Sequence, residues 1–184
     1  MHQHLPRTKY DIIMDQASNK PGEQTFEKVS GSDFSRLESI SQIPQMISGR
    51  YLGEIFRLVI CELIDEGALF LGQDTYKIER TDAVETAFLS LMESYVSYYL
   101  ALVVVLNCSR DPTDELLTII GIFTHFYALS TTLAERQFFR ALARLIGRRA
   151  AGLSACGIAA VVRKKGYLAE GCEVGADGSL YNVR

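Results

Sequence analysis

The apolar residues between Ile47 and Glu66 recur with the period of a helix. They occupy positions 47, 51, 52, 55, 58, 59 and 63, which places them in one stripe along about five helical turns. Gly67 follows directly and is a typical stop signal, because glycine readily adopts the left-handed conformation that ends a helix. The pattern therefore predicts a helix from residue 47 to residue 66.

A second and longer helix is predicted between Thr132 and Gly166. Thr132 and Glu135 form a capping-box pattern. It is followed by the apolar residues Phe138, Leu142, Leu145, Ile146, Leu153 and Ile158. Lys164 and Lys165 place cations in the last turn, and Gly166 is suited to the C-terminal cap.

Four arginines at four-residue spacing, Arg136, Arg140, Arg144 and Arg148, share one face of this predicted helix. Such a row could bind phosphate or nucleic acid. A solvated helix face explains it more simply, and we favour that interpretation.

The two ends of the chain lack long periodic patterns. Residues 1–22 are polar, contain Pro6 and Pro21, and are predicted to form a loop. Residues 173–181 are typical of a short strand, a tight Asp-Gly-Ser turn and the start of another strand. The sequence thus predicts a mainly helical chain with a short C-terminal β element.

Composition narrows the class of protein. The chain has 184 residues, of which 48% are hydrophobic, so it can build a core. Its net charge of -3 gives no electrostatic argument for nucleic acid or an anionic membrane as a partner. The four cysteines form no C-x-x-C pair, and no secretory signal is recognisable, so we expect a cytoplasmic protein with reduced thiols.

Three ordered sequence blocks carry a resemblance. The first begins with Pro-Gly-Glu-Gln-Thr-Phe-Glu-Lys at 21–28 and resumes with Met-Ile-Ser-Gly-Arg-Tyr-Leu-Gly-Glu at 46–54. The others are residues 147–162 and 174–181. Together they resemble the hexokinase family, of the fungal hexokinase and glucokinase type. The resemblance implies an α/β fold of the ribonuclease H-like (actin/hexokinase) kind, with residues 1–184 forming part of its large, C-terminal domain.

The resemblance also implies an activity, the ATP-dependent phosphorylation of a hexose at its 6-hydroxyl group in glycolysis. The hexose would be glucose, with fructose or mannose as further substrates, and ATP would act with Mg²⁺. Gln24 and Glu27 would bind the sugar: an ionised carboxylate can accept bonds from two neighbouring hydroxyls, and an amide one turn earlier can both donate and accept. No catalytic residue and no metal ligand is assigned to this chain.

The nucleotide contacts implied by the resemblance fall in three segments. Gly49 permits close backbone approach and Arg50 adds a cation, Thr86 and Ser90 offer hydroxyls on successive turns, and the turn at 177–179 can direct N–H groups at phosphate. The full set is Gly49, Arg50, Thr86, Ala87, Phe88, Leu89, Ser90, Gly178, Ser179, Leu180, Tyr181 and Asn182.

In the family the catalytic aspartate precedes the region that this chain resembles, so the chain alone is expected to be inactive. A different class of function is a non-catalytic helical regulatory or interaction module derived from a hexokinase. Retention of Gln24 and Glu27 argues against that alternative.

Two intervals, residues 29–45 and 95–110, interrupt the resemblance and are suspected insertions. Val29-Ser30, Val96-Ser97 and Val183-Arg184 can each be encoded as a 5′ splice site, and Gln45 as a 3′ splice site. Retained introns are therefore favoured over surface insertions, although insertions would also be tolerated because the cost of loop closure grows slowly with length. The apolar part of the second interval is about a dozen residues, short of the roughly 20 that a membrane span needs.

We predict that most transcripts lack the codons for residues 29–45 and 95–110 and continue beyond Asn182. The physical reason is that an insertion after Glu27 would separate this sugar ligand from the helix that starts near Gly49, whereas phosphoryl transfer depends on positioning. Amplification of cDNA across both junctions and past the stop codon tests this. A dominant product of full genomic length at both intervals would show that the insertions are genuine.

Overall fold

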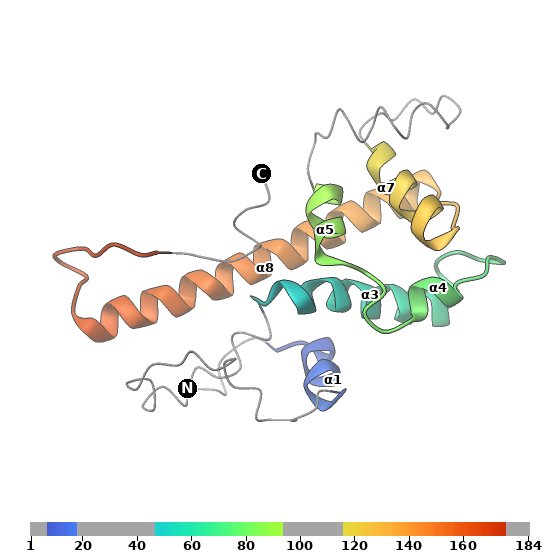
Figure 1. Ribbon diagram of the computed structural model, residues 1–184. Coiled ribbons are helices and arrows are strands. Elements are labelled where there is room, and N and C mark those ends of the chain that lie inside the picture. The colour runs from blue at the N-terminus through green and yellow to red at the C-terminus, as the bar shows by residue number, and fades with distance from the viewer. Residues whose placement is uncertain (1–6, 18–46, 94–115, 176–184) are drawn as a thin grey trace. The chain divides into compact units, whose positions relative to one another are not determined.

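The computed structural model describes residues 7–17, 47–93 and 116–175, and every regular element in these ranges is a helix (Figure 1). The two suspected insertions lie outside the described residues. Residues 173–175 have no regular structure, and the rest of the predicted β element, 176–181, is outside the described ranges. The mainly helical character is confirmed, and the β element stays a prediction.

The first predicted helix is confirmed as α3, Gly49–Asp65. Its end follows the Gly67 signal, since Gly67 has a φ of 69°. The N–H of Gly67 donates to the carbonyl of Ile64, and the N–H of Ala68 donates to the carbonyl of Leu63. This pair of bonds is a Schellman motif, which satisfies carbonyls that the helix leaves without partners.

The second predicted helix is confirmed as α8, Leu133–Lys165. At its start the Thr132 N–H donates to Glu135 Oε2 over 2.6 Å, and the Glu135 N–H donates back to Thr132 Oγ1 over 3.3 Å. At its end Gly166 has a φ of 81° and, with Tyr167, repeats the Schellman pattern on the carbonyls of Arg163 and Val162. Both termini predicted from local sequence signals are formed.

The loop predicted for residues 1–22 is wrong between Lys9 and Ala17, which form helix α1. The cause is an N-terminal cap formed by Thr8 and Asp11, a signal that was outweighed by the polar composition of residues 1–22. The N–H and hydroxyl of Thr8 both donate to Asp11 Oδ2, over 2.6 and 2.7 Å, and the Asp11 N–H donates to Thr8 Oγ1. An aspartate three residues after the cap takes the place of the usual glutamate.

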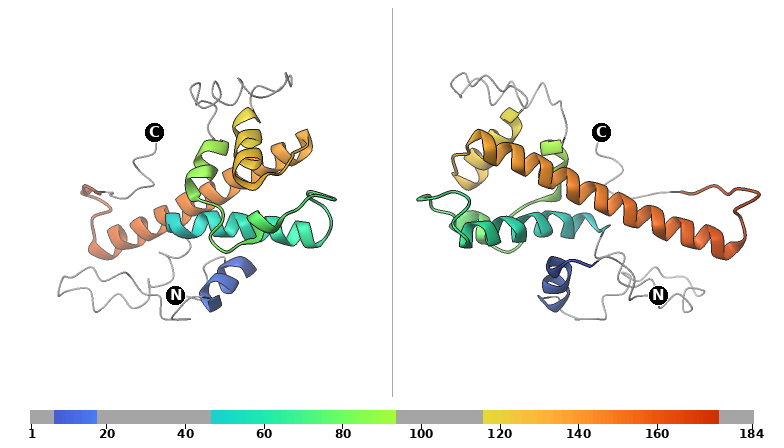
Figure 2. Two further views of the ribbon diagram at one scale, coloured as in Figure 1. Left: turned by 45° about the vertical axis from the view of Figure 1, so that its right-hand side comes forward. Right: turned by 180° about the vertical axis from the view of Figure 1, so that it is seen from behind.

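Contacts divide the chain into two units, residues 52–147 and residues 1–51 with 148–184. In the first unit, α3 is followed by α4 (Tyr76–Glu79), α5 (Thr86–Glu93), α7 (Leu117–Ile122), the π-helical segment η4 (Phe123–Tyr127) and the first part of α8. Helix α5 lies beside α7, and α4 beside η4 (Figures 1 and 2).

The core of this unit is a group of four phenylalanines from different segments. Phe123 stacks on Phe139 with ring centroids 4.4 Å apart, Phe70 lies 5.7 Å from Phe139, and Phe56 meets Phe139 edge-on at 6.2 Å. All four side chains are buried. Each aromatic pair contributes about 0.5 to 1.5 kcal/mol beyond the burial of its area, so Phe139 of α8 links α3, η4 and the loop after α3.

The loop after α3 is held to the start of α8 by side chains. Glu135 Oε1 accepts from the N–H of Phe70 over 3.1 Å. Gln73 donates to the Ser130 carbonyl and accepts from the Ser130 N–H, over 3.0 and 2.7 Å. Phe70 has a φ of 52°, which is unusual for a bulky residue, and these bonds keep the loop in that conformation.

The second unit is organised by one ion pair between α1 and α8. Arg149 donates to both carboxylate oxygens of Asp11, over 3.1 and 2.6 Å, and Asp11 is buried. A bidentate arginine–carboxylate pair fixes direction as well as distance. Because Asp11 also caps α1, one carboxylate both starts this helix and docks it.

Helix α8 is also the one helix in the described residues that is long and apolar enough to cross a membrane, judged by length and composition alone. Core helices of water-soluble proteins meet the same criterion. Several of its apolar side chains, including Ile158 and Val161, are exposed.

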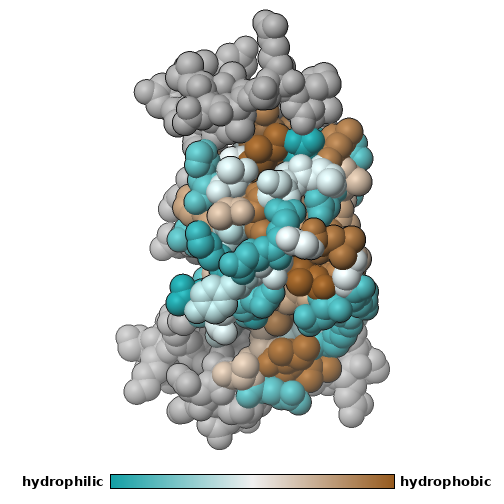
Figure 3. All heavy atoms as spheres, turned by 90° about the vertical axis from the view of Figure 1, so that its right-hand side faces the viewer, coloured by the Kyte–Doolittle hydropathy of each residue, from teal (hydrophilic) through white to brown (hydrophobic). Residues whose placement is uncertain are grey.

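In the first unit the apolar side chains of Leu71 and Phe126 are exposed as well. Figure 3 shows apolar patches among hydrophilic side chains on one face.

We predict that Gly53→Ala destabilises the chain by about 3 kcal/mol, because a Cβ at this position would lie 2.0 Å from the Val84 carbonyl oxygen. The matched control is Gly152→Ala, which meets nothing within 4 Å and should stabilise α8 by about 0.5 to 1 kcal/mol. Urea unfolding monitored by circular dichroism measures both. Equal effects of the two substitutions would contradict the close approach of α3 to residue 84.

Glu135 is expected to make stability depend on acid pH. Burial alone would raise its pKa, but hydrogen bonds from the backbone N–H groups of Thr132 and Phe70 and from the Thr132 hydroxyl bring the pKa below its usual value. A lowered folded-state pKa gives stability that is complete above the unfolded pKa of about 4.3 and is lost as the pH falls through the folded pKa. Glu135→Gln should cost about 1 kcal/mol at pH 7 and flatten the decline of stability below about pH 5.

The control for this measurement is Glu170→Gln, which changes an exposed carboxylate in the same way. Urea midpoints at several pH values compare the three proteins. An unchanged slope in Glu135→Gln would show that the cap does not contribute to acid sensitivity.

Candidate functional site

The structure describes two of the segments expected to contact a nucleotide. Gly49 and Arg50 are the first two residues of α3, and residues 86–90 form the first five positions of α5. Gln24 and Glu27, expected to bind sugar, and residues 178–182 lie outside the described residues. Of the expected site residues, the structure therefore describes those at the start of α3 and those at the start of α5.

The start of α5 is bonded to α3 at Gly53, one helical turn after Gly49. The Gly53 N–H donates to Thr86 Oγ1 over 2.9 Å. The backbone of residues 84–86 passes so close to Gly53 that no side chain fits there. Packing thus requires a glycine at this position of the 46–54 motif. The Thr86 hydroxyl accepts the hydrogen bond that joins the start of α5 to α3.

The five residues of the α5 segment divide between the core and the surface. Phe88 and Leu89 are buried, and Phe88 lies with its ring centroid 4.7 Å from that of Phe126. Thr86 and Ser90 are half-buried at i and i+4, and Ala87 is exposed. The hydroxyl-bearing side chains of this segment thus lie partly at the surface, while the two large apolar side chains anchor the helix in the core.

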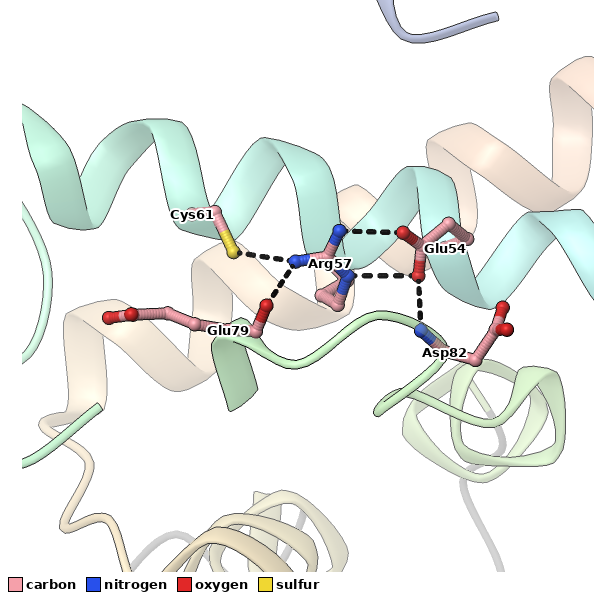
Figure 4. A network of polar contacts seen from close by, with 5 residues as sticks. All are labelled: Glu54, Arg57, Cys61, Glu79 and Asp82. Atoms are coloured by element: carbon pink, nitrogen blue, oxygen red, sulfur yellow. Dashed lines mark hydrogen bonds and ion pairs between the residues drawn. The ribbon is translucent and has the colours of Figure 1, made fainter. Parts of the chain in front are cut away.

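A buried ion pair lies beside this junction (Figure 4). Arg57 donates through Nε and Nη2 to the two carboxylate oxygens of Glu54, over 2.9 and 2.6 Å. Its Nη1 donates to the Glu79 carbonyl over 2.8 Å, and Glu54 Oε2 accepts from the Asp82 N–H over 3.0 Å. Both side chains are buried, so the pair connects α3 to the end of α4 and to the segment that precedes α5.

The network stabilises the charge of Arg57. The hydrogen bond with Glu54 raises the pKa of Arg57, although burial acts in the opposite direction. Arg57 Nη1 also approaches Cys61 Sγ at 3.2 Å. Burial raises the pKa of Cys61 despite the nearby cation, so its thiol is protonated at neutral pH and is a poor nucleophile.

Tyr127 also holds the segment that precedes α5. It is the last residue of η4, is buried, and donates its hydroxyl to the Ala83 carbonyl over 2.9 Å. Burial raises its pKa, so the hydroxyl remains a donor throughout the physiological range. After it, Ala128 takes a left-handed conformation with a φ of 59° and ends the segment.

The expected solvated row of arginines on α8 is wrong for two of its members. Arg136 and Arg140 are buried, Arg144 is half-buried and Arg148 is exposed. The reason is that the first part of α8 brings Phe139 into the core. Arg136 and Arg140 are close to Phe139 on the helix and are therefore placed at the edge of the core. Arg149, which binds Asp11, is outside the row.

Several residues that organise the site had only weak sequence signals. Glu54 and Arg57 stand at i and i+3 on a predicted helix, a spacing more often found in exposed pairs. Tyr127 lies in a π-helical segment, which the periodicity of apolar residues does not predict. The link between Gly53 and Thr86 joins residues 33 positions apart, which a single sequence does not reveal.

Comparison with known proteins identifies the family. The sequence model of the family described as Hexokinase matches residues 1–183. Hexokinase-1 of Schizosaccharomyces pombe is 40% identical over 182 residues, and hexokinase-2 of Saccharomyces cerevisiae is 37% identical over 181 residues. Hexokinase-3 of Mus musculus is 34% identical over 180 residues. The chain belongs to the hexokinase family, as its motifs predicted.

The match covers nearly all of this chain but a limited part of each relative. It includes 99% and 98% of the chain for the two yeast proteins and 30% of the length of each, and 96% of the chain but 16% of the mouse protein. Family membership assigns the actin/hexokinase fold, of which the described residues are a helical part.

Proposed function

We propose that the protein to which this chain contributes is an ATP-dependent hexose 6-phosphotransferase that acts in the cytoplasm. The observation that carries the proposal is the family match over residues 1–183. Glucose is the first candidate substrate, with fructose and mannose as further candidates. The chain spans 30% of the length of each yeast relative, so the proposal concerns the whole enzyme.

Within that enzyme this chain would supply contacts to both substrates. Gln24 and Glu27 would hold hexose hydroxyls through charge-assisted and amide hydrogen bonds. Gly49 and Arg50 at the start of α3, the segment 86–90 and the segment 178–182 would contact ATP. In support, the structure forms α3 and α5 as helices and joins their starting regions through Gly53 and Thr86.

The start of a helix is a favourable place for phosphate, because the positive end of the helix dipole is directed at the ligand. A hydroxyl at the start of α5 adds a donor or acceptor for ribose or phosphate. Mg²⁺ would arrive with ATP and neutralise phosphate charge. Among the described residues no group of three histidine, cysteine, aspartate or glutamate side chains could hold a metal.

The test of the sugar assignment is Glu27→Ala in the full-length protein without residues 29–45 and 95–110. Loss of hydrogen bonds to a charged group should weaken glucose binding by about 1.5 to 3 kcal/mol, whereas ATP binding should change much less. Isothermal titration calorimetry measures both ligands. Glu23→Ala is the matched control, because Glu23 is a neighbouring glutamate with no expected ligand.

Two results would contradict the proposal. Absence of hexose-dependent ADP formation by the full-length protein with Mg-ATP would reject the activity and favour a non-catalytic module. Unchanged glucose affinity in Glu27→Ala, with activity present, would reject only the assignment of Glu27.

A further inference from the structure

The segment between α4 and α5 is held at four places by groups from α3 and η4. Arg57 donates to the Glu79 carbonyl, Glu54 accepts from the Asp82 N–H, Tyr127 donates to the Ala83 carbonyl, and the Gly53 N–H donates to Thr86 Oγ1. All four distances lie between 2.8 and 3.0 Å. Connections between helices are usually the most mobile parts of a fold, so this number of tertiary bonds on a short segment needs a reason.

Stability alone is a weak reason. Removing two charges from water is costly, and a buried ion pair is often no more stabilising than apolar residues of similar volume. What the Glu54–Arg57 pair adds is direction, because a planar guanidinium bonded to both carboxylate oxygens keeps its remaining N–H aimed at Glu79. The pair therefore specifies a position for the segment.

The conformation of the segment supports the same conclusion. Asp82 has a φ of 57°, a left-handed conformation that few non-glycine residues adopt without support. Its N–H is the group bonded to Glu54. Two residues later, the Val84 carbonyl occupies the space that a Cβ at position 53 would need. The conformation of this turn is thus fixed both by a hydrogen bond from Asp82 to Glu54 and by the packing of Val84 against Gly53.

The residue positioned by these contacts is Thr86, the first of α5. Building on the proposed function, we propose that Glu54, Arg57 and Tyr127 are positioning residues for the nucleotide: they fix residues 79–86, so that the segment 86–90 meets ATP in one orientation. They do not contact ATP themselves. Their effect is on the affinity for nucleotide, because a mobile segment must be ordered when ATP binds.

The principal variant is Arg57→Lys in the full-length protein, which retains the charge and loses the paired bonds to Glu54 together with the reach to Glu79. We expect the KM for ATP to rise about 5- to 10-fold, with the KM for glucose and kcat within about twofold of the original values, a pattern typical of lost binding shared by ground and transition states. Tyr127→Phe, which removes one bond, should raise the KM for ATP about 2- to 3-fold.

The matched controls are Arg163→Lys and Tyr76→Phe, which make the same chemical changes at exposed positions. Both should leave all kinetic constants unchanged. Hydrogen exchange of the amides of residues 82–86 supplies a second measurement, and it should become faster in Arg57→Lys while exchange in α8 is unaltered.

Should Arg57→Lys fail to fold, the double variant Glu54→Gln with Arg57→Met replaces it, because this variant leaves no lone buried charge. A general loss of stability would lower active enzyme and kcat and leave the KM for ATP unchanged, and that result would overturn the positioning role. Absence of ATP-dependent hexose phosphorylation in the unaltered protein would instead reject the proposed function.

Discussion

The buried pair of Glu54 and Arg57 is the interaction on which the first unit depends most. Both members also bind the backbone beyond α3, since Glu54 Oε2 accepts from Asp82 and the Arg57 guanidinium donates to Glu79. Removal of one member would leave the other charged and buried, at a cost of about 3 to 5 kcal/mol. The position of the backbone between α4 and α5 is therefore set by two side chains that lie one helical turn apart.

The two long helices could be predicted from sequence because their limits are local. Thr132 with Glu135 and the glycines at 67 and 166 act within one turn of the chain, and the structure places caps at each of them. Helix α1 was missed although Thr8 and Asp11 carry a similar signal, since the overall polarity of residues 1–22 outweighed it. The motifs therefore predicted the family, and apolar periodicity with capping residues predicted α3 and α8.

Contacts distant in sequence could not be predicted in the same way. Burial of Arg136 and Arg140 depends on which side of α8 faces Phe56 and Phe123, and four-residue spacing alone is equally compatible with a solvated row. Likewise, nothing near Tyr127 in the sequence indicates that its hydroxyl meets a backbone carbonyl 44 positions earlier. These features follow from the packing of the aromatic core, which is a property of the whole unit.

The motif at residues 46–54 contains residues with structural roles beside residues that are proposed to bind a ligand. Gly53 is required because the Val84 carbonyl passes over it, and Glu54 because Arg57 and the Asp82 N–H need an acceptor. Neither requirement involves a ligand, although both residues lie a few positions after Gly49, the proposed nucleotide contact. Substitution of either residue would therefore change the position of the segment between α4 and α5, because Gly53 and Glu54 both contact the backbone of that segment.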